Sequence, residues 1–334
     1  MFTRFYVEEN LGPSAVSTGS LPPADLVQSL IAEAYESYKS VTEGKVADYI
    51  PALARTPREL FGLCVAGING AIYAAGDTDC EFSIQSIAKP FVFALVCQAL
   101  GGGEARKKIG VNSTGMAFNS VMAIELNQAR TVNPMVNAGA IATTSLAPGA
   151  TPDEKWNFIQ NGLSRFAGRK LSLNDEVYKS EAATNHRNQG IARLLESYGR
   201  IYFDPREATD VYTKQCSLSV TVKDLAVMGA TLADGGVNPI TKDRVIDAER
   251  CKRVLAVMAT AGMYEQSGDW LYEAGLPGKS GVSGGIVTIA PGKGGVGTFA
   301  PPLDESGNSV KGQLATKFLS ERLGLNLFAS RPAA

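Results

Sequence analysis

The feature that most constrains the fold is a run of apolar residues that no surface helix could carry. Residues 86–100 read SIAKPFVFALVCQAL, and after the first turn almost every position is apolar. Pro90 falls early in the run, where a first helical turn tolerates proline, and the glycines of 101–103 end it. A helix that is apolar on all sides has to be buried. The sequence therefore predicts a helix through the centre of the fold.

Short β-like segments occur near both ends of the chain. Residues 61–66 and 71–75 flank an Asn-Gly pair typical of a hairpin, and residues 285–290 and 296–300 flank a glycine-rich turn. Helical periodicity predicts further helices at residues 24–39, 118–126, 154–167, 188–199, 222–233, 248–261 and 310–323. This order predicts an α+β fold: one antiparallel sheet built from both chain ends and flanked by helices, with an adjoining helical subdomain.

The 334 residues are predicted to form one domain, residues 21–334, after an N-terminal tail of residues 1–20. Residues 21–104 and 262–334 are assigned to the sheet subdomain and residues 105–261 to the helical one. The tail has no apolar segment like that of a signal peptide, and no apolar run is long enough to span a bilayer. The five cysteines are widely spaced and form no C-x-x-C motif. We therefore expect a cytoplasmic protein that does not act at a membrane.

Composition excludes several classes of function. The net charge is −1, which gives no basic excess for holding nucleic acid. His186 is the only histidine, so sites built on several histidines, including most zinc centres, are excluded. A Ser-His-Asp triad could use only His186, and its very polar surroundings in the sequence favour a solvated position. An enzyme with this composition that uses a nucleophile is therefore expected to need a base other than histidine.

One motif supplies such a base. Ser86-Ile87-Ala88-Lys89 is the only S-x-x-K in the chain, and positions i and i+3 share one face of a helix. Ser86 stands at the start of the predicted helix, where free N–H groups favour a developing alkoxide. Burial would lower the pKa of Lys89 towards neutrality, as a base requires. These residues predict a serine hydrolase with Ser86 as nucleophile and Lys89 as its activating group.

A second motif strengthens this prediction. Lys279-Ser280-Gly281 is the only K-[S/T]-G in the chain, and it immediately precedes the predicted strand at 285–290. An S-x-x-K on a helix followed by a K-[S/T]-G at a strand belongs to the pattern of penicillin-recognising serine enzymes. In that pattern the strand lies beside the nucleophile and supplies an N–H of the oxyanion hole. The usual S-D-N is missing, since Ser172-Leu173-Asn174 is only a loose match.

Six separated blocks, in order, resemble the serine-dependent glutaminase family from about residue 24 to residue 328. The most specific is N-P-M-V-N-A-G-A-I at 133–141. The other five are Gln85-Ser86, residues 180–188, residues 212–217, residues 262–268 and Lys279-Ser280-Gly281-Val282. The resemblance implies a serine β-lactamase/transpeptidase-like fold and hydrolysis of L-glutamine to L-glutamate and ammonia, with no cofactor. It also implies a homodimer or homotetramer.

The resemblance also implies roles for individual residues. Ser86 matches the nucleophile and Lys89 its lysine partner, and Tyr49 matches a further active-site tyrosine. Either Lys89 or Tyr264 takes the serine proton, a choice that the sequence leaves open. Substrate contacts are implied for Ser86, Asn137, Glu181, Asn188, Tyr212, Tyr264 and Val282. Glu181 is a natural partner for the ammonium of a free amino acid, and the N–H groups of Ser86 and Val282 are expected to hold the oxyanion.

Two alternatives stay open. The first is a β-lactamase or peptidase of the same fold, against which stand the missing S-D-N and the expected absence of an export signal. The second is a catalytically inactive scaffold that binds glutamine or a partner protein. Against it, every matched position has a chemically competent residue. Ammonia production from glutamine by the purified protein separates these cases.

Overall fold

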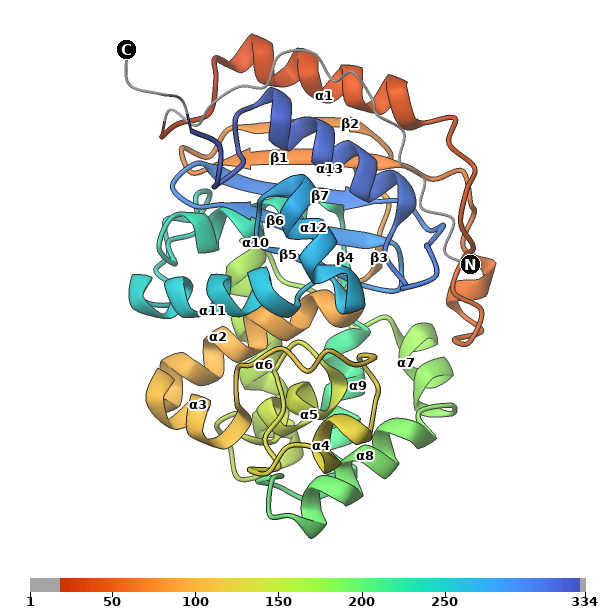
Figure 1. Cartoon of the computed structure of the whole chain (residues 1–334), viewed down its shortest axis with the longest axis vertical. Coiled ribbons are helices and arrows are strands. Elements are labelled where there is room, and N and C mark those ends of the chain that lie inside the picture. The colour runs from red at the N-terminus through yellow and green to blue at the C-terminus, as the bar shows by residue number, and fades with distance from the viewer. Residues whose placement is uncertain (1–18, 331–334) are drawn as a thin grey trace.

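A five-stranded antiparallel sheet occupies the upper half of the molecule in Figure 1. The computed structural model describes residues 19–330, so most of the predicted tail lies outside the described residues. The strand order is β2-β1-β7-β6-β5. The bounds are β1 Gly62–Gly67, β2 Ile72–Gly76, β5 Gly278–Ser280, β6 Gly285–Ala290 and β7 Gly294–Phe299. Because β1 pairs with β7, the sheet is built from both chain ends, as predicted.

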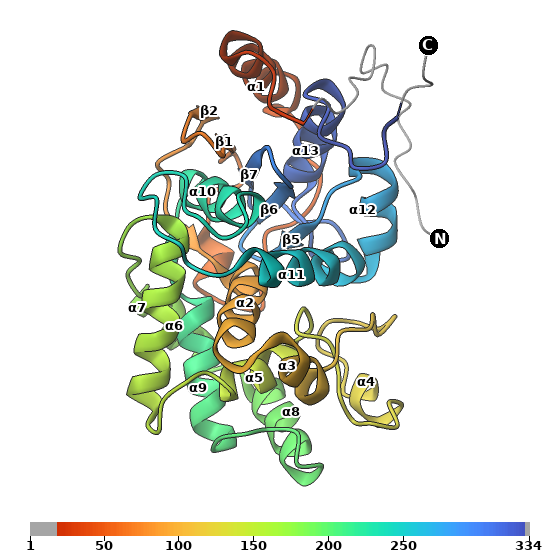
Figure 2. The same cartoon turned by 90° about the vertical axis from the view of Figure 1, so that its left-hand side faces the viewer.

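Helices cover both faces of this sheet (Figure 2). α1 (Ala24–Tyr38) and α13 (Val310–Arg322) pack together on one face, and α10 (Val222–Ala233) packs on the other against β1, β6 and β7. Covered on both sides, these three strands are buried at every position, so they read as continuous rather than alternating apolar runs. α10 falls within the range predicted for the helical subdomain, yet its packing places it with the sheet.

Two glycines on β7 set how closely α10 approaches. A Cβ added at Gly295 would lie 2.3 Å from the Ala226 carbonyl oxygen, and one at Gly297 would lie 2.3 Å from the Val222 carbonyl oxygen. Both distances are far shorter than van der Waals contact. The backbone of the helix therefore rests directly on the strand, which only glycine at these positions allows.

The central apolar run forms a buried helix, as predicted. α2 spans Ala88–Leu100, and every residue from Ala88 to Cys97 is buried. It packs against helices from both halves, including α11 (Ala248–Ala261) and α6 (Pro152–Ala167). One detail differs from the prediction, because a 3-10 turn, η2 (Gln85–Ile87), precedes the α-helix. Ser86 therefore lies on this tight turn and not in the helix itself.

The remaining elements are short, and most of them form the lower, helical half in Figure 1. They are η1 (Leu53–Arg55), β3 (Phe82–Ser83), α3 (Gly102–Ile109), α4 (Met122–Glu125), α5 (Asn137–Ser145), α7 (Asp175–Ala182), α8 (His186–Ser197), α9 (Pro205–Cys216), β4 (Ser219–Val220), η3 (Tyr264–Gln266) and α12 (Ser267–Ala274). No helix in the described part of the chain is long and apolar enough to cross a membrane.

The predicted helix at 118–126 is wrong in extent, since only Met122–Glu125 is helical. The Phe118 carbonyl accepts the Asn137 N–H at 2.7 Å, so it is not used to begin a helix. α3, α5, α7, α9 and α12 were not predicted from the sequence. Isolated helices this short are marginal in water, so packing against the rest of the fold supplies most of their stability.

Candidate active site

Ser86 lies where the two halves of the molecule meet. Its side chain is nearly buried, and the η2 turn that carries it packs against β5 and β6. Lys279 and Ser280 belong to β5 itself, an edge strand that the sequence did not predict. The structure therefore brings the S-x-x-K and K-S-G motifs side by side, as their order in the chain led us to expect.

The residue before Ser86 has an unusual backbone conformation. Gln85 has a φ of 49°, in the left-handed region that favours glycine. Its buried side chain donates from Nε2 to Ser83 Oγ at 3.2 Å and to Glu181 Oε2 at 3.3 Å. These contacts hold a strained conformation that presents Ser86. Gln85 was quoted only as part of a resembling block and was not predicted to be a site residue.

Lys89 is fully buried beneath the site. Its Nζ donates to Asn137 Oδ1 at 2.7 Å and to the Met135 carbonyl at 3.4 Å. Burial lowers the pKa of Lys89 to about 8, and the nearby Glu181 carboxylate opposes that shift. Within the described residues, its hydrogen bonds go to these two partners and not to Ser86. The amine is nevertheless of the kind predicted, a buried lysine that loses its proton near neutrality.

Tyr264 contacts Ser86. Its hydroxyl donates to the Ser280 carbonyl at 3.1 Å and also hydrogen-bonds with the Ser86 side chain. Its φ is 54°, so Tyr264, like Gln85, has its backbone in the left-handed region. Burial raises the pKa of Tyr264 well above its usual value, while the hydrogen bond with Ser86 acts in the opposite direction. The phenol is therefore neutral and able to donate.

Lys279 is a site residue that the sequence analysis named only as part of a motif. It is fully buried, and its Nζ lies 4.4 Å from the centre of the Tyr264 ring. It donates at 2.8 Å to the Ser280 carbonyl, the same oxygen that accepts from Tyr264. Burial, and secondarily the charge of Lys89, lowers the pKa of Lys279 well below its usual value. The sequence signal that could have identified Lys279 as a site residue was its position in the K-S-G motif.

Four predicted substrate contacts come from four different helices. Asn137 begins α5, Glu181 is near the end of α7, Asn188 is in the first turn of α8 and Tyr212 is on α9. Asn137 Nδ2 donates to Asn188 Oδ1 at 2.9 Å, and the Tyr212 hydroxyl donates to Asn137 Oδ1 at 3.4 Å. Burial raises the pKa of Glu181 to about 7. The structure therefore brings these polar groups together beside Ser86 and Lys89.

Val282 and Tyr49 complete the predicted set. Val282 lies in the turn between β5 and β6, packs with Tyr264, and its N–H has no hydrogen-bond partner among the described residues. That free donor suits the oxyanion role expected for it. Tyr49 is 55% exposed, yet burial of its hydroxyl, together with Tyr264 and Glu181 nearby, raises its pKa. The ring therefore borders solvent while its hydroxyl faces the site.

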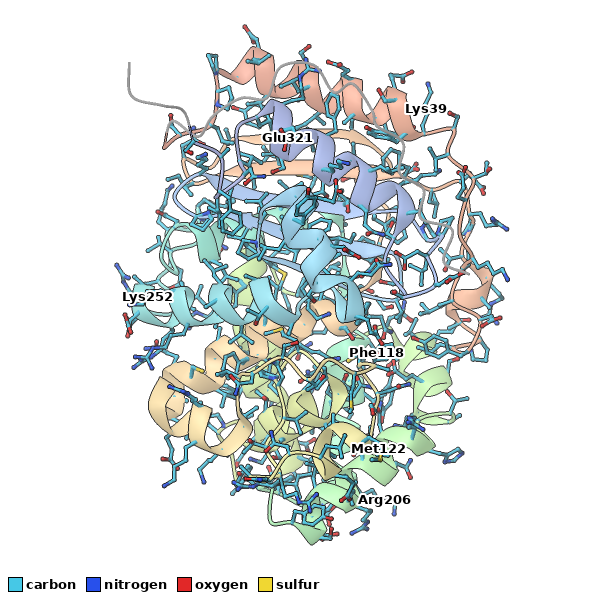
Figure 3. All side chains as sticks on the ribbon, in the orientation of Figure 1. Lys39, Phe118, Met122, Arg206, Lys252 and Glu321 are labelled. Carbon is cyan, nitrogen blue, oxygen red and sulfur yellow. The ribbon has the colours of Figure 1, made fainter. Side chains whose placement is uncertain are left out.

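The side chains on the helical side of the site meet those of the sheet side at Phe118. Figure 3 labels Phe118 at the boundary between the two halves. Its ring lies 4.9 Å from the ring of Tyr264, centre to centre, and 5.9 Å from Lys89 Nζ. Among residues 19–330, no group of three or more histidine, cysteine, aspartate or glutamate side chains is placed to hold a metal ion. The site therefore combines the Ser86 hydroxyl, the buried amine of Lys89 and the Tyr264 phenol with two side-chain amides and the Glu181 carboxylate.

Comparison with known proteins agrees with this geometry. The sequence profile of the Glutaminase family matches residues 44–328. Glutaminase 2 of Yersinia pestis is 63% identical over 95% of this chain and 93% of its own length. A glutaminase of Colwellia psychrerythraea is 50% identical over 92% of this chain and 99% of its own length.

Solved structures agree as well. That of the probable glutaminase YbaS superposes with a TM-score of 0.91 at 45% identity, covering 92% of this chain and all of the other. A structure of Mglu in its L-glutamate binding form gives a TM-score of 0.84 at 40% identity, over 92% of this chain and 68% of that one. The α+β fold predicted from the sequence is thereby confirmed. The chain belongs to the glutaminase family.

Proposed function

We propose that the protein hydrolyses L-glutamine to L-glutamate and ammonia through an acyl-enzyme on Ser86. The observation that carries this proposal is the junction of Ser86 with Tyr264, Lys89 and the carboxylate of Glu181. A glutaminase needs a nucleophile for the side-chain amide and a separate set of groups for the free amino acid. Ser86 and its neighbours provide the first, and Glu181 with Asn137 and Asn188 provides the second.

The proton chemistry divides between two residues. A base needs a pKa near the working pH, and Lys89, with its pKa of about 8, meets that requirement better than the neutral phenol of Tyr264. Lys89 takes the Ser86 proton as the oxygen attacks the amide carbon. The proton is delivered through Tyr264, which contacts Ser86, to the departing nitrogen. The carbonyl oxygen, negative in the intermediate, is held by the N–H groups of Ser86 and Val282.

Glu181 binds the free ammonium group of the substrate. Its carboxylate is buried and receives a hydrogen bond from Gln85, so it is oriented before substrate binds. The amides of Asn137 and Asn188 and the phenol of Tyr212 offer the directional donors and acceptors that a carboxylate and a carboxamide need.

A cytoplasmic location and a homodimeric or homotetrameric state belong to the same proposal. Light scattering that showed a monomer at micromolar concentration would contradict the oligomeric part.

Replacing the nucleophile tests the mechanism. Ser86→Ala removes the attacking oxygen, so ammonia release should fall by roughly 10⁴-fold or more, while the melting temperature stays close to that of the wild type. Ser320→Ala is the matched control, since Ser320 is also a buried serine but lies on α13, where its hydroxyl donates to the Ala274 carbonyl at 2.6 Å. Full ammonia release by Ser86→Ala would overturn the acyl-enzyme.

A second pair of variants separates the base from the proton donor. Tyr264→Phe should lower kcat but keep the rise of rate with pH near 8, because Lys89 remains. Lys89→Met should remove that rise. If Tyr264→Phe removes the rise instead, the roles assigned to the two residues are reversed.

A further inference from the structure

A cavity of about 130 Å³ adjoins the catalytic candidate Tyr264. It lies between the loop of residues 113–118, the end of α11 and the start of α12. Its exposed lining includes Thr260, Glu265 and Gly268, and its buried lining includes Met135 and Tyr264. Of the predicted substrate contacts, which are all in the described part of the chain, only Tyr264 lines it. The cavity therefore runs from the surface to the back of the catalytic phenol.

The volume of the cavity limits which molecules can occupy it. Sites for organic ligands usually enclose about 300–1,000 Å³, well above the volume found here. A water molecule takes about 30 Å³ of liquid volume, so a few molecules of that size fit. Ammonia and water meet this limit. A second amino acid or a nucleotide does not.

The inner end of the cavity adjoins both proton-transfer groups. The Tyr264 hydroxyl contacts Ser86, and the ring of Phe118, which also lines the cavity, lies 4.9 Å from the Tyr264 ring. Met135, another lining residue, gives its carbonyl to Lys89 Nζ at 3.4 Å. The lining of the cavity therefore includes Tyr264 itself and Met135, whose carbonyl binds Lys89.

The reaction requires a route by which ammonia can leave the site next to Tyr264. As the acyl-enzyme forms, Ser86 Oγ bonds to the amide carbon, the carbon–nitrogen bond breaks, and the nitrogen leaves as ammonia with a proton delivered through Tyr264. The glutamyl chain then remains on the side of Ser86 that Glu181 and Asn137 border. Ammonia leaving on that side would have to pass the covalently held chain. On the Tyr264 side it meets the cavity.

We propose that this cavity is the exit path of ammonia and the entry path of the water that hydrolyses the acyl-enzyme, an inference that rests on the mechanism proposed above. Phe118 separates the cavity from Ser86 and moves aside for each passage. Glu265 at the mouth lies close enough to Tyr264 to act on it electrostatically, and its carboxylate attracts the ammonium that ammonia becomes in neutral water. Glutamate leaves by the other side.

Gly268 provides a way to narrow the path without disturbing the fold. It is exposed in the first turn of α12, and a Cβ added there meets no atom within 4 Å. Gly103 occupies the same position in α3, is also exposed, and also has open space around an added Cβ, but it does not line the cavity. The series Gly268→Ala, →Leu and →Phe is therefore matched by the same three substitutions of Gly103.

Capture of the acyl-enzyme by hydroxylamine measures the path itself. Hydroxylamine competes with water and yields γ-glutamyl hydroxamate, so the ratio of hydroxamate to glutamate does not depend on how much protein is folded. We expect this ratio to fall progressively across the Gly268 series, several-fold for Gly268→Phe, because hydroxylamine is larger than water. The Gly103 series should leave it unchanged.

The outcomes are distinguishable. A ratio that stays constant across the Gly268 series, while wild type forms hydroxamate, overturns the path but leaves the acyl-enzyme standing. If wild type forms no hydroxamate at any hydroxylamine concentration, the acyl-enzyme itself is wrong and the path falls with it. The graded series retains the test even if the phenylalanine variant does not fold.

Discussion

The sheet half and the helical half of the molecule are held together in different ways. In the sheet half, β1, β6 and β7 are buried along their whole length between α10 on one side and α1 and α13 on the other. In the helical half, short helices bring polar side chains to the junction from α5, α7, α8 and α9. One half therefore provides a rigid wall for Ser86, and the other provides the polar groups that we propose bind the substrate.

Buried lysines show that burial alone does not make a lysine a site residue. In the sheet half, Lys293 Nζ donates to the Gly324 carbonyl at 2.6 Å, and Lys311 Nζ donates to the Lys39 carbonyl at 3.1 Å. Both join two segments of backbone, and burial lowers the pKa of each. Lys89 is buried too, but its Nζ donates to the side chain of Asn137, a proposed substrate contact. A lowered pKa alone does not identify a catalytic lysine; the partners of the amine do.

The largest predicted effect lies in the helical half and concerns specificity. A buried carboxylate that loses its ammonium partner is left with an uncompensated cost of desolvation. Wild type should therefore prefer L-glutamine to N-acetyl-L-glutamine by on the order of 10⁴ in kcat/KM, and Glu181→Gln should reduce that preference strongly. Comparing both substrates with both proteins measures it.

The control for this experiment is Glu176→Gln. Glu176 lies on the same helix, α7, but is exposed and pairs with Arg55 at the surface, so its loss should change neither rate nor specificity. Should wild type accept the acetylated substrate almost as well as glutamine, Glu181 does not read the ammonium.

The same residue should make stability and activity respond oppositely to pH. Burial raises the pKa of Glu181 from its ordinary 4.5 to about 7, so between these values the folded protein binds more protons than the unfolded chain. Stability from this group is therefore full below pH 4.5 and is lost as pH rises to about 7, by roughly 3 kcal/mol. Ammonium recognition needs the charged form, so kcat/KM should fall as pH drops below 7.

Denaturant unfolding of wild type and Glu181→Gln at pH 5 and pH 8 tests the sign. The variant should be the more stable protein at pH 8, and its advantage should shrink at pH 5. An equal difference at both values would mean that burial does not penalise the charge of Glu181.

The two halves also differ in how much of them the sequence predicts. β1, β6, β7 and α10 follow from apolar runs and turn residues, because their burial is almost continuous. α7 and α9 have mostly polar sequences, and α9 buries polar residues such as Thr209, Thr213 and Gln215. Apolar spacing alone therefore does not mark their buried faces, although Asn174 and Asp204 cap their first turns. The site residues on them were found through resemblance alone.

No local sequence pattern predicted how the helices and strands are placed relative to one another. That Lys279 and Tyr264 share the Ser280 carbonyl depends on how β5 packs against η3, and that Gln85 holds Glu181 depends on contact across the junction. Such contacts join residues far apart in the sequence. They become visible only in the fold.

The smallest predicted effect compares one glycine from each half. At Gly295 a Cβ would lie 2.3 Å from the Ala226 carbonyl, so Gly295→Ala must push α10 from the sheet, and such overpacking costs about 1–3 kcal/mol of unfolding free energy. At Gly103 an added Cβ meets open space in α3, so Gly103→Ala should instead stabilise by about 0.4–1 kcal/mol, through the lower entropy of the unfolded chain. Urea unfolding of the two variants measures both changes, and kcat/KM per folded molecule should stay constant for Gly103→Ala. Opposite signs are required if the sheet half is packed backbone to backbone while this surface of the helical half is not. A Gly295→Ala protein as stable as wild type would show that α10 can shift at no cost, and that the wall behind Ser86 is less rigid than its burial indicates.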